Sequence, residues 1–165
     1  MPRQLLRDGR VVADDWRYLA DAGYDVPACA EGGLILTFER WLADKACRLA
    51  ASGRLGVVLS PAHKLEQLAP DLSRFDLIAA EFSGPSEGRG YTQGRLLRER
   101  YQFKGELRAT GYVRRDQVFF LARCGFNSFE LPDGEMAGAS KALRTFSAEY
   151  QPSNDAGLAF QLQRR

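Results

Sequence analysis

Short apolar runs alternate with amphipathic stretches through most of the chain. Five of the runs have the length and composition of strands, and they lie at residues 34–38, 55–60, 76–82, 105–113 and 126–131. A helical pattern follows each of them, at about 40–52, 61–70, 92–102, 114–124 and 135–150. Several of the runs, such as "GVVL" and "LIAA", are apolar on both faces, as a parallel sheet covered by helices requires. The pattern predicts an α/β fold of five consecutive βα units with a mainly parallel sheet.

Five such units fit two architectures. One is an open flavodoxin-like sheet with helices on both faces, and the other is a partial TIM-type barrel with helices outside. The short repeats favour the barrel-like form slightly, and the sequence leaves both open. In either architecture the loops that follow the strands gather at the carboxyl edge of the sheet, where binding sites collect.

The first residues precede the alternating strands and helices, and their pattern predicts a small N-terminal β-hairpin. In "LLRDGRVV", Asp8-Gly9 stands between two short apolar runs, which favours a tight type I′ turn. Asp14 or Asp15 then offers the cap of a short helix, with Gly23 as its end. We therefore expect one α/β domain over residues 1–150, with the hairpin and short helix of residues 1–24 as an appendage, and a poorly ordered tail at 151–165.

The composition is that of an ordinary globular protein, but its basic residues are unevenly placed. The 165 residues carry a formal net charge of +2. Between Gly88 and Arg115, eight basic residues stand against two acidic ones, so this stretch carries +6 and the remainder −4. The total charge is modest for a protein that binds nucleic acid, although aromatic residues are interleaved with the basic ones. We expect no nucleic acid partner.

Other residues narrow the function further. Cys29, Cys47 and Cys124 lie far apart and form no Cys-x-x-Cys pair, so the sequence predicts neither a metal site nor a disulfide framework. The single histidine, His63, has no evident partner, which argues against a histidine-based triad. No apolar run approaches the ~20 residues of a membrane helix, and the polar start lacks a signal-peptide pattern. We expect a cytoplasmic protein without a membrane partner.

An enlarged loop, "SGPSEGRGY", follows the third predicted strand. Its glycines, Gly88, Gly90 and Gly94, come close to a dinucleotide-binding fingerprint. The third glycine comes one residue late, however, and no ribose-binding acid follows about 20 residues on. Enlarged loops at the carboxyl edge of a sheet are often functional. The loop is therefore a candidate site, but not for a dinucleotide.

An anion is the ligand that this loop suits best. Thr92 is a good N-cap for the helix that follows, and a helix N-terminus presents free N–H groups to an anion. Arginines from the loop, the helix and the next strand are expected to converge on the same edge, where guanidinium groups match sulfite, sulfate or phosphate. The predicted anion-binding residues are Gly88, Arg89, Gly90, Tyr91, Thr92, Arg95, Arg98 and Arg108.

Two acids at this edge are weak catalytic candidates. Glu81 ends the third predicted strand, and Asp116 comes just after the fourth. Either could act as acid or base, but orienting the arginines is the favoured role, because nearby arginines would depress a carboxylate pKa. No redox cofactor motif is found, so the cofactor and the question of catalysis stay open.

Several stretches resemble a known bacterial family. The most specific are the loop and helix "GRGYTQGRLLRERY" and the strand "GELRATG", and the likeness extends from the N-terminal hairpin to "FSAEYQ". They are similar to the domain of unknown function nine-three-four, whose members are described as oxidoreductases encoded beside sulfite reductase. The residues that carry the resemblance overlap the predicted anion site.

The resemblance implies a role in assimilatory sulfur metabolism, with sulfite reductase as a candidate partner. The first hypothesis is an anion-binding accessory protein that delivers substrate to sulfite reductase or docks a redox partner. The second is a small enzyme, an oxidoreductase by resemblance, that acts on a phosphorylated or sulfur-containing metabolite. The third is a non-catalytic docking surface for sulfite reductase.

Overall fold

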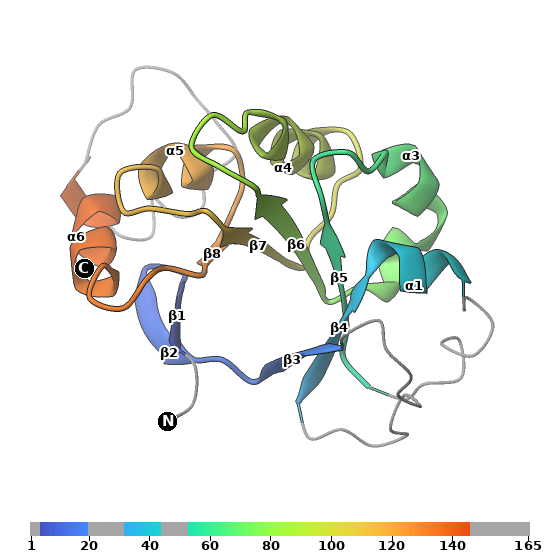
Figure 1. Ribbon diagram of the computed structural model, residues 1–165, viewed down its shortest axis with the longest axis horizontal. Helices are drawn as coiled ribbons and strands as arrows, with labels where there is room; N and C mark the ends of the chain where they lie inside the picture. Colours follow the sequence, from blue (N-terminus) through green and yellow to red (C-terminus); the bar gives the residue numbers. More distant parts are fainter. Residues whose placement is uncertain (1–3, 20–31, 44–52, 146–165) are drawn as a thin grey trace.

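The strands form a strongly curled sheet with the shape of a half-barrel (Figure 1). The computed structural model describes residues 4–19, 32–43 and 53–145. Across the sheet the strand order is β2-β1-β8-β7-β6-β5-β4-β3. In chain order the strands are β1 Gln4–Arg7, β2 Arg10–Ala13, β3 Trp16–Leu19, β4 Gly33–Thr37, β5 Leu55–Leu59, β6 Leu77–Phe82, β7 Glu106–Gly111 and β8 Ser128–Phe129.

Most of the sheet is parallel, as predicted. The strands from β3 to β8 run in one direction, and the hairpin of β1 and β2 runs against them through the antiparallel pairing of β1 with β8. The predicted strands at 34–38, 55–60, 76–82 and 105–113 correspond to β4, β5, β6 and β7. The mixed α/β fold is therefore confirmed, and its sheet is curled rather than flat.

Helices cover the convex side of this sheet (Figure 1). They are α1 Phe38–Ala43, α3 Leu65–Leu68, the 3-10 helix η1 Ala69–Arg74, α4 Arg89–Glu99, α5 Val118–Arg123 and α6 Met136–Thr145. The main core lies between these helices and the sheet. It contains large side chains such as Trp41 and Phe126, which are fully buried. In the described ranges no helix has the length and apolar character needed to cross a membrane.

The concave side of the sheet has a different character. Strand side chains alternate between the two faces, so residues next to those of the main core point inward. Trp16, Ile35 and Leu77 form part of a separate apolar cluster there. Beside this cluster the inward residues of β7 are polar, with Arg108 at 0% exposure. The concave face is therefore apolar around Trp16, Ile35 and Leu77 and charged around Arg108.

The predicted hairpin is confirmed, but it is part of the sheet and not an appendage. Asp8 and Gly9 have φ angles of 49° and 75°, the positive values that a type I′ turn requires. β1 hydrogen-bonds along β8 and buries Leu5 and Leu6. Because β8 has only two residues, the hairpin extends the sheet beyond a strand that would otherwise be a short edge.

The short helix predicted after Asp14 and Asp15 was wrong, because Trp16–Leu19 form strand β3. Asp14 does accept the backbone N–H of Trp16, at 3.2 Å, as a cap would. The chain then extends, since aromatic side chains suit a strand and β3 pairs in parallel with β4. Gly23, the expected end of the helix, lies outside the described residues.

The remaining differences concern the ends of elements. The strand predicted at 126–131 contains only Ser128–Phe129, and the helix predicted at 61–70 begins at Leu65. A turn precedes it, in which the N–H of His63 bonds to the carbonyl of Ser60. The predicted ends of the helices at 40–52 and 135–150, and the tail at 151–165, lie outside the described residues.

Candidate functional site

A carboxylate occupies the start of α4, the position where the sequence predicted an anion. Oε1 of Glu87 accepts the backbone N–H of Arg89 at 2.9 Å and its Nε–H at 3.1 Å, and Oε2 accepts Nη2–H at 3.0 Å. The Ser83 hydroxyl donates to Oε2 at 3.4 Å. The Arg89 side chain, followed by its backbone N–H, holds the pKa of Glu87 below its usual value. Donors for a negative group thus converge at this point.

The predicted role of Thr92 as the N-cap was wrong. Helix α4 begins at Arg89, and Gly88 is its N-cap, with φ −90° and no capping side chain. Thr92 lies exposed in the second turn of the helix. Glu87 supports the earlier start, because its carboxylate accepts the N–H of Arg89, one of the four N–H groups of the first turn that have no partner inside the helix.

Gly90 serves packing, and not the close approach of a ligand. A Cβ on Gly90 would lie 2.6 Å from two ring atoms of Phe82, at the end of β6. Neither Gly88 nor Gly90 has a positive φ. Tyr91 meets the same Phe82 ring edge to face, with the ring centroids 5.3 Å apart. The first turn of α4 therefore sits directly on the aromatic end of β6.

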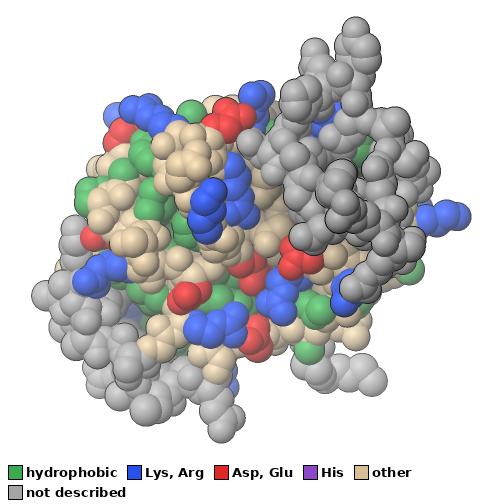
Figure 2. All heavy atoms as spheres, turned by 180° about the vertical axis from the view of Figure 1, so that it is seen from behind, with side chains coloured by type: hydrophobic (Ala, Val, Ile, Leu, Met, Phe, Trp, Pro, Cys, Tyr) green, Lys and Arg blue, Asp and Glu red, His purple; other side chains and the backbone are tan. Residues whose placement is uncertain are grey.

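The predicted arginines do not converge on one edge. Arg95 is exposed and pairs with Glu99 one turn along α4, at 3.3 Å. Arg98 points to the loops under the helix, and its side chain donates to the carbonyl groups of Gly125, Phe103 and Gly105 at 2.9, 2.6 and 3.0 Å. Burial lowers the pKa of Arg98. On the face shown in Figure 2, Lys and Arg side chains lie among Asp and Glu side chains.

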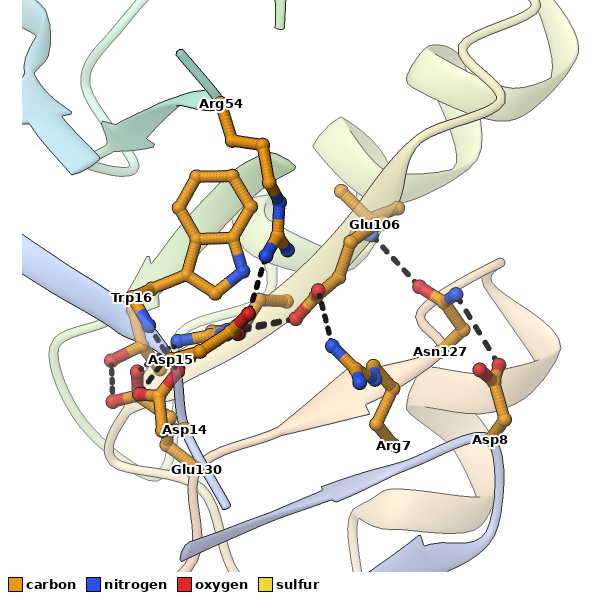
Figure 3. A network of polar contacts seen from close by, with 12 residues as sticks. Arg7, Asp8, Asp14, Asp15, Trp16, Arg54, Glu106, Asn127 and Glu130 are labelled. Atoms are coloured by element: carbon orange, nitrogen blue, oxygen red, sulfur yellow. Dashed lines mark hydrogen bonds and ion pairs between the residues drawn. The ribbon is translucent and has the colours of Figure 1, made fainter. Parts of the chain in front are cut away.

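Arg108 lies on the other side of the sheet from α4, at the centre of a buried network. Its Nη1 and Nη2 donate to Oδ2 and Oδ1 of Asp14, both at 3.1 Å. Its Nε and Nη2 donate to Oε1 of Glu106 at 3.1 and 2.9 Å, and Nη1 donates to Oε1 of Glu130 at 3.2 Å. The exposed fractions of these three acidic side chains are 2%, 9% and 6%. Figure 3 shows the acids approaching from the β2–β3 link, from β7 and from the segment after β8.

Further polar groups surround these acids. Arg7 donates to Oε2 of Glu106 at 3.4 Å, and Glu130 accepts the hydroxyl groups of Tyr18 and Thr110, both at 2.6 Å. Burial and the neighbouring Glu130 raise the pKa of Tyr18. Burial alone would lower the pKa of Arg108, but the charges of Glu106 and Asp14 raise it above its usual value. Arg108 is therefore held firmly in its charged form.

Among the described residues, three acids and two arginines make up the charged groups of this network. Asp14, Glu106 and Glu130 stand against Arg7 and Arg108, so these five residues carry a formal charge of −1. Two polar atoms near them are buried and have no hydrogen-bond partner in the structure, namely Nε1 of Trp16 and Oγ of Ser128. Ser128 is the register partner of Arg108 on the adjacent strand. Such unsatisfied groups are rare in folded proteins and require an explanation.

The two weak catalytic candidates differ in their position relative to this network. Glu81 is exposed at the end of β6, in register with Thr110 of β7. Asp116 is exposed in the turn that precedes α5. Within the described ranges no group of three or more His, Cys, Asp or Glu side chains could hold a metal ion.

The sequence interpretation missed the partners of the single histidine. Nε2 of His63 lies 2.7 Å from Oε1 of Glu39, and Nδ1 accepts the backbone N–H of Ser60 at 3.0 Å. The ring also stacks on Phe38, with centroids 4.3 Å apart. Because Nδ1 is an acceptor, the proton of the neutral ring is on Nε2 and faces Glu39. Both ring nitrogens are thus engaged in joining α1 to the turn after β5.

The sequence interpretation also missed the acids around Arg108. One signal was present in "ELRAT", where Glu106, Arg108 and Thr110 alternate with Leu107 and Ala109. A strand that is covered on both faces is expected to be apolar throughout, so three polar residues at every second position mark a polar inner face. Asp14 gave no comparable signal.

A known protein family matches the part of the chain that forms most of the sheet and its helices. A family model for bacterial proteins of unknown function matches residues 56–160, a range that begins in β5 and contains α4, β7 and β8. The hairpin, the β2–β3 link and β3 supply Arg7, Asp14 and Tyr18 respectively, and all three precede the matched range. No curated protein matches the chain. The match extends over more than half of the sequence, and the chain therefore belongs to the family of bacterial proteins of unknown function DUF934.

Proposed function

We propose that the protein is an accessory protein of assimilatory sulfite reduction that binds a small oxyanion at the start of α4. The observation that carries the proposal is the Glu87 carboxylate, which is held by the N–H and guanidinium of Arg89 and by the Ser83 hydroxyl. Backbone N–H groups at a helix start and a guanidinium fork are also the donors that bind sulfite, sulfate or phosphate.

The position of these residues supports the proposal. The curl of the sheet favours the barrel-like of the two architectures, and binding sites in barrels lie at the carboxyl edge of the strands. The loop from Ser83 to Gly88 follows β6 at that edge. A free anion that approached this edge would meet the exposed side of the Arg89 guanidinium.

Glu87 is an internal competitor for such a ligand. The side chain of Arg89 is 67% exposed, whereas that of Glu87 is 10% exposed. An oxyanion would reach Arg89 from its exposed side and compete there with the Glu87 carboxylate, which on displacement would turn into solvent. Of the predicted anion-binding residues, Gly88 and Arg89 would take part in this site, whereas Gly90 packs on Phe82 and Arg98 and Arg108 have other partners.

The link to sulfite reduction rests on the family resemblance. An accessory role suits a chain without a redox cofactor motif, because the protein would deliver the oxyanion or dock a redox partner and leave electron transfer to sulfite reductase. The exposed Glu81, close in sequence to the anion loop, supports the alternative of a small enzyme that acts on a phosphorylated or sulfur-containing metabolite. In that case turnover would be lost in Glu81→Gln.

Calorimetric titration with sulfite, sulfate and phosphate at constant ionic strength tests the anion site. We expect Arg89→Ala to abolish binding and Glu87→Gln to strengthen it, because the amide competes less well for the same donors. Arg95→Ala is the matched control, since it removes the same charge from an exposed ion pair on the same helix. Equal affinity in Arg89→Ala and the unmodified protein would exclude this site.

The accessory role needs a separate measurement. Size-exclusion chromatography of the protein mixed with sulfite reductase, with and without sulfite, shows whether the two form a complex. A complex supports the accessory role, and a complex without any anion binding supports the simpler docking surface. Anion binding without a complex would leave the site in place and remove the accessory role.

A further inference from the structure

The turn at residues 132–135 connects the segment after β8 to α6 and contains Asp133-Gly134, one of the two Asp-Gly pairs of the sequence. The N–H of Glu135 donates to the carbonyl of Pro132 at 3.2 Å, and Gly134 has a φ of 88°. This bond, with a positive φ at the third residue, is typical of a type II turn. Pro132, Asp133 and Gly134 are all exposed, so water reaches the turn from several sides.

An aspartate that precedes a glycine can react with its own backbone. The amide nitrogen of the glycine attacks the side-chain carbon Cγ, and a water molecule leaves as a five-membered succinimide ring closes. Water then opens the ring at either carbonyl, which restores aspartate or leaves isoaspartate, with the main chain running through the former side chain. The reaction needs only water, and glycine favours it because no side chain shields its nitrogen and its backbone rotates freely.

The surroundings of Asp133 leave both reacting groups accessible. Its carboxylate forms no hydrogen bond or ion pair in the part of the chain that the structure describes. The space beside Gly134 is open, because no atom would lie within 4 Å of a Cβ placed there. Among the described residues, the 3.2 Å bond from Glu135 to Pro132 is the backbone hydrogen bond that closes this turn. A local opening that breaks this bond therefore lets the peptide of Asp133 rotate toward ring closure.

The other Asp-Gly pair, Asp8-Gly9, has the same two residues but is held in place. The N–H of Asp8 donates to the carbonyl of Asn127 at 2.9 Å, and its Oδ1 accepts Nδ2–H of Asn127 at 3.3 Å. Gly9 is buried, and its carbonyl accepts the hydroxyl of Ser140 at 2.8 Å. The strands on both sides are paired in register. Ring closure at Asp8 would therefore require the hairpin to separate from β8 and α6.

We propose that Asp133 is a site of isoaspartate formation in the folded protein, whereas Asp8 is protected by the fold. The modification has a structural consequence, because isoaspartate adds a methylene group to the main chain shortly before Glu135. Oε1 of Glu135 accepts Nη1–H of Arg114 at 2.8 Å, and Oε2 accepts the backbone N–H of Arg115 at 2.8 Å. These bonds join the start of α6 to the turn after β7, and the lengthened chain loosens them. The proposal does not depend on the oxyanion site at the start of α4.

The first test compares the two Asp-Gly pairs in the same chain. The unmodified protein is incubated at neutral pH, folded in buffer and unfolded in urea, and is then digested after lysine. This digestion separates the two pairs into the peptides 1–45 and 105–141, and mass spectrometry with electron-transfer fragmentation locates isoaspartate in each. We expect isoaspartate at Asp133 under both conditions and at Asp8 only in urea. Accumulation at Asp133 in urea alone, or equal accumulation at Asp8 and Asp133 in the folded protein, would overturn the proposal.

The second test asks whether the modification loosens Glu135. Carbon-detected NMR titration of the aged protein should show a second Glu135 signal, with a midpoint closer to the usual 4.5 than that of the original signal. Asp133→Glu is the matched control, because it keeps the negative charge but would have to close a larger ring, which forms slowly. This variant should keep one Glu135 signal through the same incubation. An unchanged Glu135 midpoint in a sample that contains isoaspartate at residue 133 would refute the structural consequence.

Discussion

Gly94 of α4 lies so close to the ring of Phe126 that a Cβ on it would stand 2.3 Å from the ring atom Cε2. One turn earlier, Gly90 has the same relation to Phe82. Residues four apart share one face of a helix, so the two glycines let α4 lie directly on a layer of aromatic rings. Gly90 and Gly94 thus reflect helix–sheet packing, which explains why the spacing that begins at Gly88 only approaches a dinucleotide fingerprint.

Gly94→Ala should therefore destabilise the protein. Overpacking against Phe126 is expected to cost about 1–3 kcal/mol, only partly offset by the ~1 kcal/mol by which alanine favours a helix over glycine. Urea unfolding measures the difference. Gly88→Ala is the control, because no atom lies within 4 Å of its added Cβ. Equal stability of the two variants would mean that the Phe126 ring moves aside without cost.

Arg98 is expected to be structural. Its side chain donates to three carbonyl groups in the loops that precede β7 and β8, those of Phe103, Gly105 and Gly125. Arg98→Ala leaves these acceptors without a donor, and we expect a loss of about 2–4 kcal/mol in the free energy of unfolding. Arg95 lies on the same helix but is exposed, so Arg95→Ala should change the free energy of unfolding by less than about 0.5 kcal/mol. Chemical denaturation of both variants compares them, and similar losses would contradict the assignment.

Arg108 should be the most sensitive arginine of the chain's described part. Arg108→Met keeps much of the side-chain volume but leaves Asp14, Glu106 and Glu130 without their shared cation. Breaking a buried ion pair from one side costs about 3–5 kcal/mol, so the variant should be largely unfolded or strongly destabilised at neutral pH. Circular dichroism during thermal unfolding measures this, with Arg95→Met as the surface control. A melting temperature close to that of the unmodified protein would show that the network contributes little to stability.

The sequence predicted those strands whose own residues indicate that both of their faces are covered. β5 and β6 are apolar at nearly every position, because helices cover one of their faces and the inside of the curl covers the other. The Asp8-Gly9 turn could also be predicted, because its conformation depends on these two residues themselves. β3 was not predictable in this way, since its four residues become a strand through pairing with β4 and through the Trp16 ring, which lies where a Cβ of Gly33 would be.

The candidate site was harder to predict for the same reason. In the sequence, Arg95, Arg98 and Arg108 lie in one basic stretch. In the structure Arg95 is exposed, Arg98 contacts the loops under α4, and Arg108 lies on the concave face of the sheet. One of the partners of Arg108, Asp14, is 94 residues away in the chain. Only the start of α4 combined a local motif with local partners, because Ser83, Glu87 and Arg89 are close in the chain.

The carboxyl groups of Glu87 and Glu135 should both titrate below the usual glutamate pKa of 4.5. The Arg89 side chain is the main cause for Glu87. For Glu135 the main cause is the backbone N–H of Arg115 at 2.8 Å, followed by the side chain of Arg114. Carbon-detected NMR titration of the side-chain carboxyl groups gives each midpoint directly.

The direction of the effect on stability follows from these shifts. Between the lowered native pKa and 4.5, the unfolded chain binds more protons than the native protein, so the free energy of unfolding rises with pH in this window. The contribution is complete above the usual value and is lost as the pH falls through the native pKa. Arg89→Ala should move the midpoint of Glu87 back toward 4.5 and leave that of Glu135 unchanged, because their donors are separate. A Glu87 midpoint that stays low in Arg89→Ala would mean that the N–H groups at the start of α4 hold the anion without the guanidinium.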